Sequence, residues 1–295
     1  LIDSIINTND SWRITLFTSG TTGLPKKVSH SFHSITRFVK ISTEKSKNIW
    51  GFAYNPTHIA GVQVFFQALL NGNQIVRLFG LPKESIYNEI ENYNITNISA
   101  TPTFYRLLIP FDGTLNSVKR ITSGGEKFDE QIITNLSAIF PNAKVTNVYA
   151  STEAGTLFAS EGNLFVIKSE ISQYIRIDED ELLIHKSFMG DSEMSKDEWY
   201  RTGDIIKIVS ENPTKFYFVS RKNEMINVGG YKVNPNEVEE EIRRIDGIKD
   251  VRVFSKSNSV LGNVICCEVI RVNEQITESL IRNHLQQVLQ EFKIP

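Results

Sequence analysis

Short β-prone runs alternate with helical stretches over the first two thirds of the chain, and this alternation constrains the fold more than any other feature of the sequence. Apolar side chains recur at helical spacing between the β-prone runs, as at Ile86 and Ile90. The predicted strands are 13–17, 49–54, 74–78, 95–100, 118–122 and 144–149, and the predicted helices are 59–70, 83–93 and 129–140. Strands that alternate with helices form a largely parallel sheet with helical crossovers. We therefore predict an α/β fold whose ligands bind at the carboxyl ends of the strands.

The alternation ends near Trp199, and the following residues predict a small α+β region. Segments 215–220 and 225–228 resemble a pair of short strands. Asn234 and Pro235 predict the start of a helix, because Asn is a favoured N-cap residue and Pro suits the first turn. The remaining predicted elements are strands at 251–254 and 264–270 and a last helix capped by Thr277.

The length and composition agree with two packed domains. The chain has 295 residues, of which 40% are hydrophobic and 22% charged, as in globular proteins. We predict a large domain over residues 1–220 and a small domain over 221–295. The net charge of −2 with no basic block argues against nucleic acid as a partner. No apolar run approaches the roughly 20 residues that span a bilayer, so no membrane span is expected.

The chain has two cysteines, Cys266 and Cys267, and they are adjacent. A disulfide framework needs separated partners, and a metal site needs ligands at spacings that this chain lacks. We expect the two residues on opposite faces of a strand in a reducing cytoplasm.

A Gly- and Thr-rich loop follows the first predicted strand, with the sequence Thr18-Ser19-Gly20-Thr21-Thr22-Gly23-Leu24-Pro25-Lys26. Glycines let the backbone approach an anion, hydroxyl groups donate hydrogen bonds to phosphate oxygens, and Lys26 adds a positive charge. The common nucleotide-binding loop has a second Gly five residues after its first, where this chain has Pro25. By composition alone such a loop is also typical of a surface turn.

The order of these residues, however, resembles the signature loop of the adenylate-forming superfamily, which includes acyl-CoA synthetases, peptide-synthetase adenylation domains and luciferases. Four further elements follow in the order of that family. They are Ser123-Gly124-Gly125-Glu126, Tyr149-Ala150-Ser151-Thr152-Glu153, Tyr200-Arg201-Thr202-Gly203-Asp204, and Ser220-Arg221-Lys222-Asn223 running into residues 227–233. Five ordered elements make a chance match improbable. The resemblance implies a large nucleotide-binding domain followed by a small mobile domain.

The resemblance assigns the phosphates and the metal to two of these elements. The loop residues Thr18, Ser19, Gly20, Thr21, Thr22, Gly23 and Lys26 would hold the β- and γ-phosphates of ATP. Thr152 would hydrogen-bond the α-phosphate, and Glu153 would carry Mg²⁺, a hard cation that prefers carboxylate oxygen. Lys26, Thr152 and Glu153 are thus the candidate catalytic residues. Without the motif, Glu153 would be an ordinary surface acid, and Lys27 stands where relatives usually have Gly.

The resemblance implies that other motif residues contact the adenine and the ribose. Gly124, Gly125 and Glu126 would form one side of the adenine slot, with Tyr149 as a flat stacking surface and Ala150 in place of the usual Gly. Packing at a strand end is the alternative role of Tyr149. Asp204 would accept both ribose hydroxyls, because an ionised carboxylate is a pure acceptor. Arg221 would donate to the ribose region, or be a solvated charge at the domain junction.

The remaining roles concern the acyl group and the second half-reaction. Asn223 matches the position about which the two domains of relatives pivot. Gly230 matches a glycine beside the pantetheine tunnel of thioester-forming members, although a simple turn is the alternative. His58 matches a residue often found by the acyl pocket, although a lone His near an apolar helix is as often a packing residue. His30 and His33 receive no role.

One catalytic group of the family has no counterpart in the printed sequence. Relatives use a lysine on a loop shortly after a segment similar to residues 291–295, where this sequence stops. Relatives also carry a long N-terminal subdomain. We therefore expect a fragment that is truncated at both ends and slow at forming an acyl-adenylate.

The resemblance thus implies an AMP-forming acid–thiol ligase that uses ATP, Mg²⁺ and coenzyme A. The segment 55–60 contains no acid that could bind a substrate amine, which favours a plain carboxylic acid. Two alternatives stay open. The acyl or aminoacyl group could pass to the pantetheine of a carrier protein, or the chain could be a nucleotide-binding scaffold without catalytic activity.

Overall fold

The computed structural model describes residues 12–18, 26–126, 130–192, 197–222, 224–229, 231–258, 262–272 and 274–295. The chain divides into two compact units. The first reaches to Asp178 and also includes Leu183–Thr202 and Ile208–Tyr217. The second consists of Glu179–Leu182, Gly203–Lys207 and Phe218–Pro295. None of the helices in the described ranges has the length and apolar character needed to cross a lipid bilayer.

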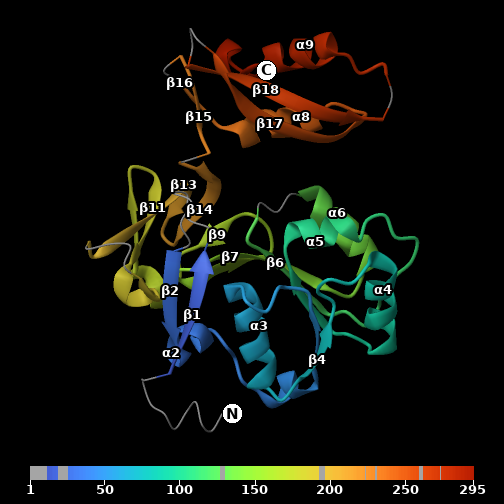
Figure 1. The fold of residues 1–295 in the computed structure, drawn as a ribbon, viewed down its shortest axis with the longest axis vertical. Helices are drawn as coiled ribbons and strands as arrows, with labels where there is room; N and C mark the ends of the chain where they lie inside the picture. Colours follow the sequence, from blue (N-terminus) through green and yellow to red (C-terminus); the bar gives the residue numbers. More distant parts are fainter. Residues whose placement is uncertain are drawn as a thin grey trace. The chain divides into compact units, whose positions relative to one another are not determined.

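A six-stranded sheet is the centre of the first unit (Figure 1). Its strands, in spatial order, are β4 (Gln74–Arg77), β3 (Ile49–Phe52), β5 (Asn97–Ala100), β6 (Arg120–Gly124), β7 (Lys144–Ser151) and β8 (Gly155–Ser160). The first five strands are parallel to one another, and β8 is antiparallel to β7. The predicted α/β fold with a largely parallel sheet is therefore confirmed.

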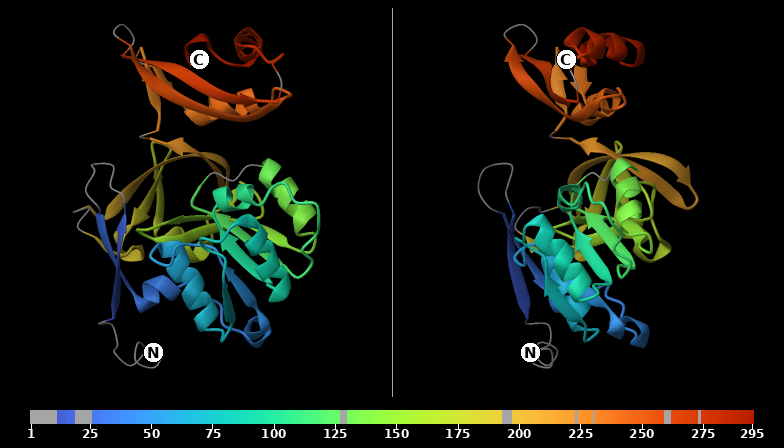
Figure 2. Two further views of the ribbon diagram at one scale, coloured as in Figure 1. Left: turned by 45° about the vertical axis from the view of Figure 1, so that its right-hand side comes forward. Right: turned by 90° about the vertical axis from the view of Figure 1, so that its right-hand side faces the viewer.

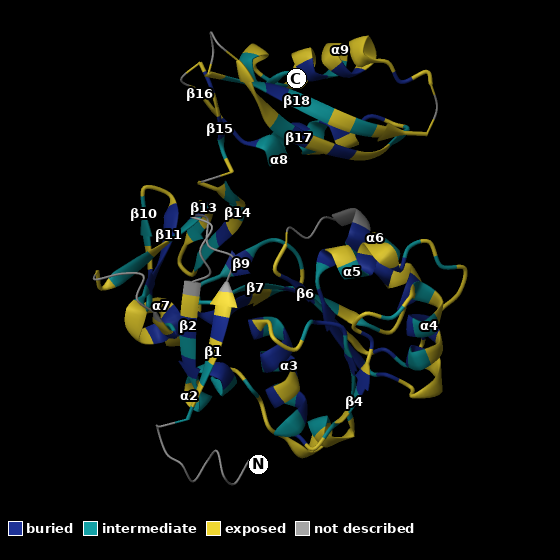
Figure 3. Ribbon diagram, viewed as in Figure 1, coloured by how far each residue is buried: buried dark blue, intermediate teal, exposed yellow. Residues whose placement is uncertain are grey.

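Helices connect the parallel strands, as the alternation predicts. They are α3 (Ile59–Leu69), α4 (Lys83–Asn92), α5 (Pro102–Leu107) and α6 (Glu130–Ile139). Buried side chains of α4, α5 and α6 share one apolar cluster with the sheet strands, and their outer faces are exposed (Figure 3). The buried face of α3 belongs to a second cluster, which includes Leu16 and Ile35.

A smaller sheet carries the ends of the Gly- and Thr-rich loop. It consists of β1 (Arg13–Thr18), β2 (Lys26–Ser31) and β12 (Asp191–Ser192), with β2 in the middle. Both neighbours are antiparallel to β2. Helix α2 (Phe32–Thr36) follows β2 directly. The sequence patterns predicted β1 but not β2 or β12.

The third sheet has five strands in the order β10 (Ile175–Asp178), β11 (Glu181–His185), β13 (Trp199–Glu211), β14 (Thr214–Arg221) and β9 (Phe165–Val166). The segment that resembles the family's Thr-Gly-Asp element lies within the long strand β13. Short elements, α7 (Ser169–Ser172) and η3 (Lys186–Phe188), lie between these strands in the sequence.

The C-terminal part has two separate hairpins. The two short strands predicted at 215–220 and 225–228 are both present, and they belong to different sheets. The first belongs to β14, which lies between β13 and β9, whereas β15 (Ile226–Val228) pairs with β16 (Tyr231–Val233). Strand pairing depends on contacts beyond the local pattern, so the sequence predicts the two strands but not their partners. The second hairpin joins β17 (Ile248–Asn258) and β18 (Gly262–Arg271).

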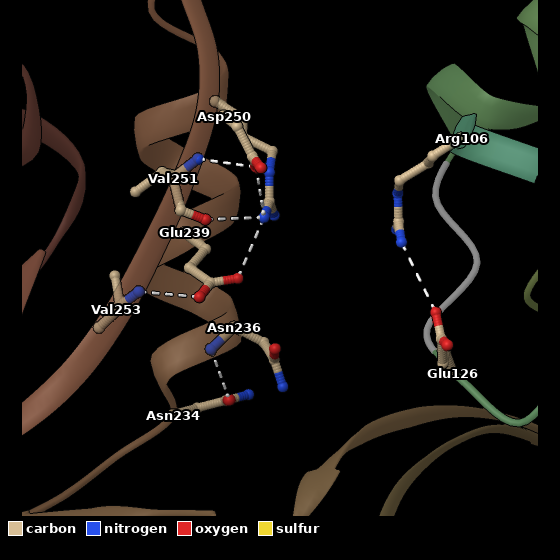
Figure 4. Close-up of polar contacts among 9 residues, drawn as sticks. Arg106, Glu126, Asn234, Asn236, Glu239, Asp250, Val251 and Val253 are labelled. Atoms are coloured by element: carbon tan, nitrogen blue, oxygen red, sulfur yellow. Dashed lines mark hydrogen bonds and ion pairs between the residues drawn. The ribbon is translucent and has the colours of Figure 1, made fainter. Parts of the chain in front are cut away.

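Two helices complete the C-terminal core, α8 (Pro235–Arg243) and α9 (Glu278–Val288), followed by η4 (Glu291–Lys293). Both helices pack beside the long hairpin (Figure 2). The predicted caps are confirmed: Asn234 accepts a hydrogen bond from the Asn236 amide (Figure 4), and Thr277 accepts one from the Leu280 amide. Cys266 and Cys267 are adjacent, half-buried, free residues of β18, as predicted from their spacing.

Candidate active site

The Gly- and Thr-rich loop connects the antiparallel strands β1 and β2. Thr18 ends β1, Lys26 begins β2, and the two residues pair across the hairpin. Ser19, Gly20, Thr21, Thr22 and Gly23 lie outside the described residues, as do the side chains of Thr18 and Lys26. Their phosphate-binding roles therefore stay predictions.

Gly124 ends β6, the strand next to β7. A Cβ atom at this position would lie 2.5 Å from Val148 Cγ2 and 2.8 Å from the Val148 carbonyl oxygen. No real Cβ tolerates contacts this short, so the close approach of β7 requires glycine. Gly125 follows at the carboxyl end of β6, where ligands bind in sheets of this kind.

The carboxylate of Glu126 is engaged with the start of α5. Its Oε2 atom accepts hydrogen bonds from the backbone amide and the hydroxyl of Thr103, at 3.1 and 2.6 Å. Arg106 Nη1 lies 3.7 Å from the same oxygen (Figure 4). An acid is stabilising at a helix N-terminus. Glu126 therefore links the Gly124–Gly125 turn to α5, and its predicted role beside adenine stays a prediction.

The second motif of the sheet lies at the end of β7. Tyr149 packs against Phe158 of β8 with ring centroids 5.8 Å apart and planes inclined by 33°. The pairing of β7 with β8 is irregular between Tyr149 and Ala150. Because β6 and β7 are parallel neighbours and Gly124 pairs with Val148, Gly124 and Tyr149 lie at the same edge of the sheet.

Thr152 and Glu153 follow β7 in a turn whose backbone is held from several directions. Ser151 Oγ accepts a hydrogen bond from the Ala154 amide at 3.1 Å. The carbonyl of Thr152 lies 2.7 Å from His30 Nε2, and the carbonyl of Glu153 accepts a 2.7 Å hydrogen bond from the Gly190 amide. Thr152 and Glu153 are adjacent in the sequence. A threonine hydroxyl can donate a hydrogen bond to a phosphate oxygen, and a carboxylate is a ligand that Mg²⁺ prefers.

His58 is the N-cap residue of α3, and its exposed side chain makes no capping hydrogen bond. The preceding loop is held by Asn55, whose Oδ1 accepts hydrogen bonds from the amide and the hydroxyl of Thr57. The position of His58 before an apolar helix is as expected, and its role at an acyl pocket stays a prediction.

Asp204 and Arg221 form an ion pair within the second unit. Arg221 Nε donates to Asp204 Oδ1 at 2.9 Å. The Asp204 side chain is 8% exposed, whereas that of Arg221 is 55% exposed. The sequence assigned both residues to the ribose, and the structure brings them together from β13 and β14.

Glu181 is a buried acid that the sequence analysis missed. Its side chain is 3% exposed, Oε1 accepts a 3.0 Å hydrogen bond from the Gly203 amide, and Oε2 lies 3.4 Å from Lys222 Nζ. Glu181 therefore contacts the residue before Asp204 and the residue after Arg221. A charged residue at the start of the otherwise apolar run Leu182–Ile184 was the available signal.

The structure does not test three further predictions, which concern Asn223, Gly230 and the metal site. Asn223 and Gly230 lie outside the described residues, so their hinge and pantetheine roles stay predictions. Among the described side chains, no group of three or more His, Cys, Asp or Glu residues is placed to hold a metal ion.

Comparison with known proteins decides the family. The model of the family described as AMP-binding enzyme matches residues 4–174, which is more than half of the chain. The chain belongs to the AMP-binding enzyme family. This membership confirms the resemblance deduced from the five ordered elements.

Individual relatives of this AMP-binding enzyme chain are distant. It is 26% identical over 303 residues to VraA of Staphylococcus haemolyticus, provisionally named as a long-chain fatty acid–CoA ligase, with 95% of this chain and 64% of that protein covered. It is 22% identical over 326 residues to bacitracin synthase 3 of Bacillus licheniformis, covering 95% of this chain and 5% of that protein. The chain thus spans 64% of the length of the CoA ligase relative.

A solved structure supports the fold. The chain superposes on o-succinylbenzoate coenzyme A synthetase (MenE) of Bacillus subtilis, determined in complex with ATP and magnesium ion, with a TM-score of 0.73. The identity is 20%, and the superposition covers 95% of this chain and 64% of that one. At this identity the likeness establishes the shared fold.

Proposed function

We propose that this chain is part of an enzyme that activates a carboxylic acid as its acyl-adenylate and then transfers the acyl group to the thiol of coenzyme A. The observation that carries the proposal is the placement of two family motifs at the ends of adjacent parallel strands. Gly124 ends β6, and the segment from Tyr149 to Glu153 covers the end of β7 and the following turn. This edge of an α/β sheet is where ligands bind.

The first half-reaction would join the acid to AMP. The carboxylate oxygen of the substrate attacks the α-phosphorus of ATP, and the bond to pyrophosphate breaks. Catalysis of phosphoryl-type transfer is mainly positioning and charge stabilisation. Lys26 would neutralise the β- and γ-phosphates, and Thr152 would donate to an α-phosphate oxygen. Bound Mg²⁺ would neutralise charge on the leaving pyrophosphate, and Glu153 would hold it.

The nucleoside would be held by residues of several family motifs. Tyr149 would stack on adenine, with Gly124, Gly125, Glu126 and Ala150 around it. The carboxylate of Asp204 would accept from the ribose hydroxyls, and Arg221, which already pairs with Asp204, would donate to the same region. The Asp204 carboxylate is held in one orientation by Arg221, which reduces the ordering cost of binding.

The second half-reaction would cleave the acyl–phosphate bond. A thiolate attacks the acyl carbonyl, a thioester forms, and AMP leaves. Coenzyme A is the proposed acceptor because the relatives that match along most of this chain include proteins named as CoA ligases. Asn223 would be the hinge for this step, Gly230 would border the pantetheine arm, and His58 would contact the acyl group. We place the enzyme in the cytoplasm, where ATP and coenzyme A are available.

A carrier-protein pantetheine is the second candidate acceptor. The match to bacitracin synthase 3 favours it, because that protein is named as a synthase and not as a CoA ligase. The segment Asn55–Ala60 favours a plain acid over an amino acid, because it has no carboxylate to bind an amine. Transfer assays with coenzyme A and with a phosphopantetheinylated carrier protein would separate the two.

Calorimetry tests whether the chain binds nucleotides, which the proposed function requires. The folded chain should bind AMP and ATP with Mg²⁺, and it should not bind a non-nucleotide polyphosphate of equal charge. Mass spectrometry of reactions with ATP and a panel of carboxylic acids should then detect an acyl-adenylate. A well-folded chain that gives no heat with either nucleotide would contradict the proposed function.

A further inference from the structure

A buried histidine connects the strand after the Gly- and Thr-rich loop to the Thr152–Glu153 turn. His30 lies on β2 and is only 1% exposed. Its Nε2 atom lies 2.7 Å from the Thr152 carbonyl oxygen, and its Nδ1 atom lies 2.8 Å from Ser34 Oγ. The two bonded residues Thr152 and His30 are 122 positions apart in the sequence.

The partners of the ring define its protonation. A carbonyl oxygen can only accept a hydrogen bond, so Nε2 carries the proton and donates it to Thr152. Nδ1 is then unprotonated in the neutral ring and accepts from the Ser34 hydroxyl. Burial lowers the pKa of His30, which favours this neutral form. Both ring nitrogens therefore have a partner, and the ring has one orientation.

Gly190 contacts both the His30 ring and the Thr152–Glu153 turn. A Cβ atom there would lie 2.7 Å from His30 Cε1 and 2.8 Å from Nδ1, so the ring packs directly against the glycine. The Gly190 amide donates to the Glu153 carbonyl at 2.7 Å. The next residues form β12, which pairs with β2. Two successive carbonyls of the turn are thus held, one by His30 and one by Gly190.

Holding these two carbonyls fixes the direction in which the Glu153 side chain leaves the backbone. Each carbonyl belongs to a planar peptide unit, one before and one after the Glu153 Cα atom. When both planes are fixed, the backbone dihedral angles of Glu153 and its Cα–Cβ direction are fixed as well. Loss of the His30 hydrogen bond frees the first plane, which Thr152 and Glu153 share.

We propose that His30 is a positioning residue for the ATP·Mg²⁺ site, because its Nε2–H holds the Thr152 carbonyl and so directs Thr152 and Glu153 toward phosphate and metal. This inference rests on the proposed function. It also couples the two motifs, since β2 begins at Lys26 and carries His30 four residues later.

The test compares ATP affinity in Mg²⁺ with ATP affinity in EDTA, a ratio that we call the Mg²⁺ gain. In His30→Leu the Mg²⁺ gain should fall about tenfold, as expected for loss of one well-placed hydrogen bond. His30→Gln should restore most of it, because Gln Nε2 stands the same number of bonds from Cα as His Nε2 and can donate to Thr152. The control His33→Leu changes an exposed neighbour on α2 and should leave the gain unchanged.

The outcomes separate this inference from the proposed function. A wild-type chain without heat on ATP addition contradicts the proposed function itself. A wild-type Mg²⁺ gain that persists in His30→Leu, or one that His30→Gln fails to restore, contradicts the positioning role. A purely structural role of His30 would weaken ATP binding equally with and without Mg²⁺.

A measurement on the unaltered protein covers the case in which His30→Leu does not fold. Proton–nitrogen correlation spectra of the histidine rings at neutral pH should show a slowly exchanging Nε2–H for His30 and an unprotonated Nδ1. Assignment follows from loss of the signal in His30→Gln. A ring protonated at Nδ1 and not at Nε2 would overturn the proposal.

Discussion

Glu181 accepts a hydrogen bond of 3.0 Å from the backbone amide of Gly203, the residue directly before Asp204. The second carboxylate oxygen lies 3.4 Å from the ammonium group of Lys222, the residue directly after Arg221. The Lys222 amide in turn donates to the Gly203 carbonyl at 2.7 Å. Glu181 therefore links the two strands that present the Asp204–Arg221 pair.

Replacing Glu181 should destabilise this arrangement. In Glu181→Ala the Gly203 amide loses its acceptor in a buried place, which costs about 1–3 kcal/mol. Glu181→Gln keeps an oxygen for the amide and should lose less. Urea unfolding measures both, with Glu179→Ala in the preceding turn as a control. A Glu181→Ala protein as stable as the wild type would show that the buried acid does not support the pair.

Asp204→Ala should weaken AMP binding by roughly 1–3 kcal/mol, because the ribose hydroxyls would lose the charged acceptor that the proposed function assigns to them. Asp178→Ala is the matched control, since Asp178 also forms a 2.9 Å ion pair with an arginine, Arg201. Exposed pairs of this kind contribute little, and the control should bind AMP normally. Calorimetric AMP affinities that fall equally in both variants would contradict the ribose role of Asp204.

If the proposed function holds, Glu153→Gln should reduce pyrophosphate release with only a modest loss of AMP affinity. The amide keeps the size of the side chain but removes the charge that a hard cation requires. Loss of one charge-stabilising group in a transition state typically lowers the rate about 10²–10³-fold. A pyrophosphate release assay over a range of Mg²⁺ concentrations measures this. Unchanged release would exclude Glu153 as the metal ligand.

Gly124→Ala should destabilise the chain by about 1–3 kcal/mol, because the new methyl group meets Val148 at 2.5 Å and neither strand can move freely. Gly162→Ala is the matched control, since a Cβ atom there has no heavy atom within 4 Å. Thermal unfolding of the two variants should differ clearly. Equal melting temperatures would show that β6 and β7 can separate at no cost.

The stability of the first unit should fall in mild acid because of His30. Burial, followed by the charge of Arg37, lowers the pKa of His30, although Thr152, Glu153 and Asp191 oppose this. Below the ordinary pKa of 6.5 the unfolded chain binds a proton that the folded chain does not, so the free energy of unfolding decreases as the pH falls toward the folded pKa. Urea midpoints at pH 7.5 and 5.5 should differ more for the wild type than for His30→Gln. An equal acid loss in both would exclude His30 as its source.

Most elements of the first unit follow from local sequence patterns. The apolar spacing of Ile86 and Ile90 and the β-prone run at 95–100 each act within one element, and such patterns depend only on the geometry of a helix or strand. The order of the five motifs likewise identified the family before any contact was known. The caps at Asn234 and Thr277 could be predicted for the same reason, since a cap bonds residues two or three positions away.

Only the tertiary structure decided which distant residues meet. The sequence alone determined the α/β class, the motif positions and most helix and strand positions, because these depend on neighbouring residues. It did not reveal that β14 pairs with β13 and β9, that Glu181 bonds Gly203, or that His30 bonds Thr152. These contacts join residues 22 and 122 positions apart, and no local pattern encodes such a separation. They form because sheet pairing and burial bring polar groups together in places where each buried group needs a partner.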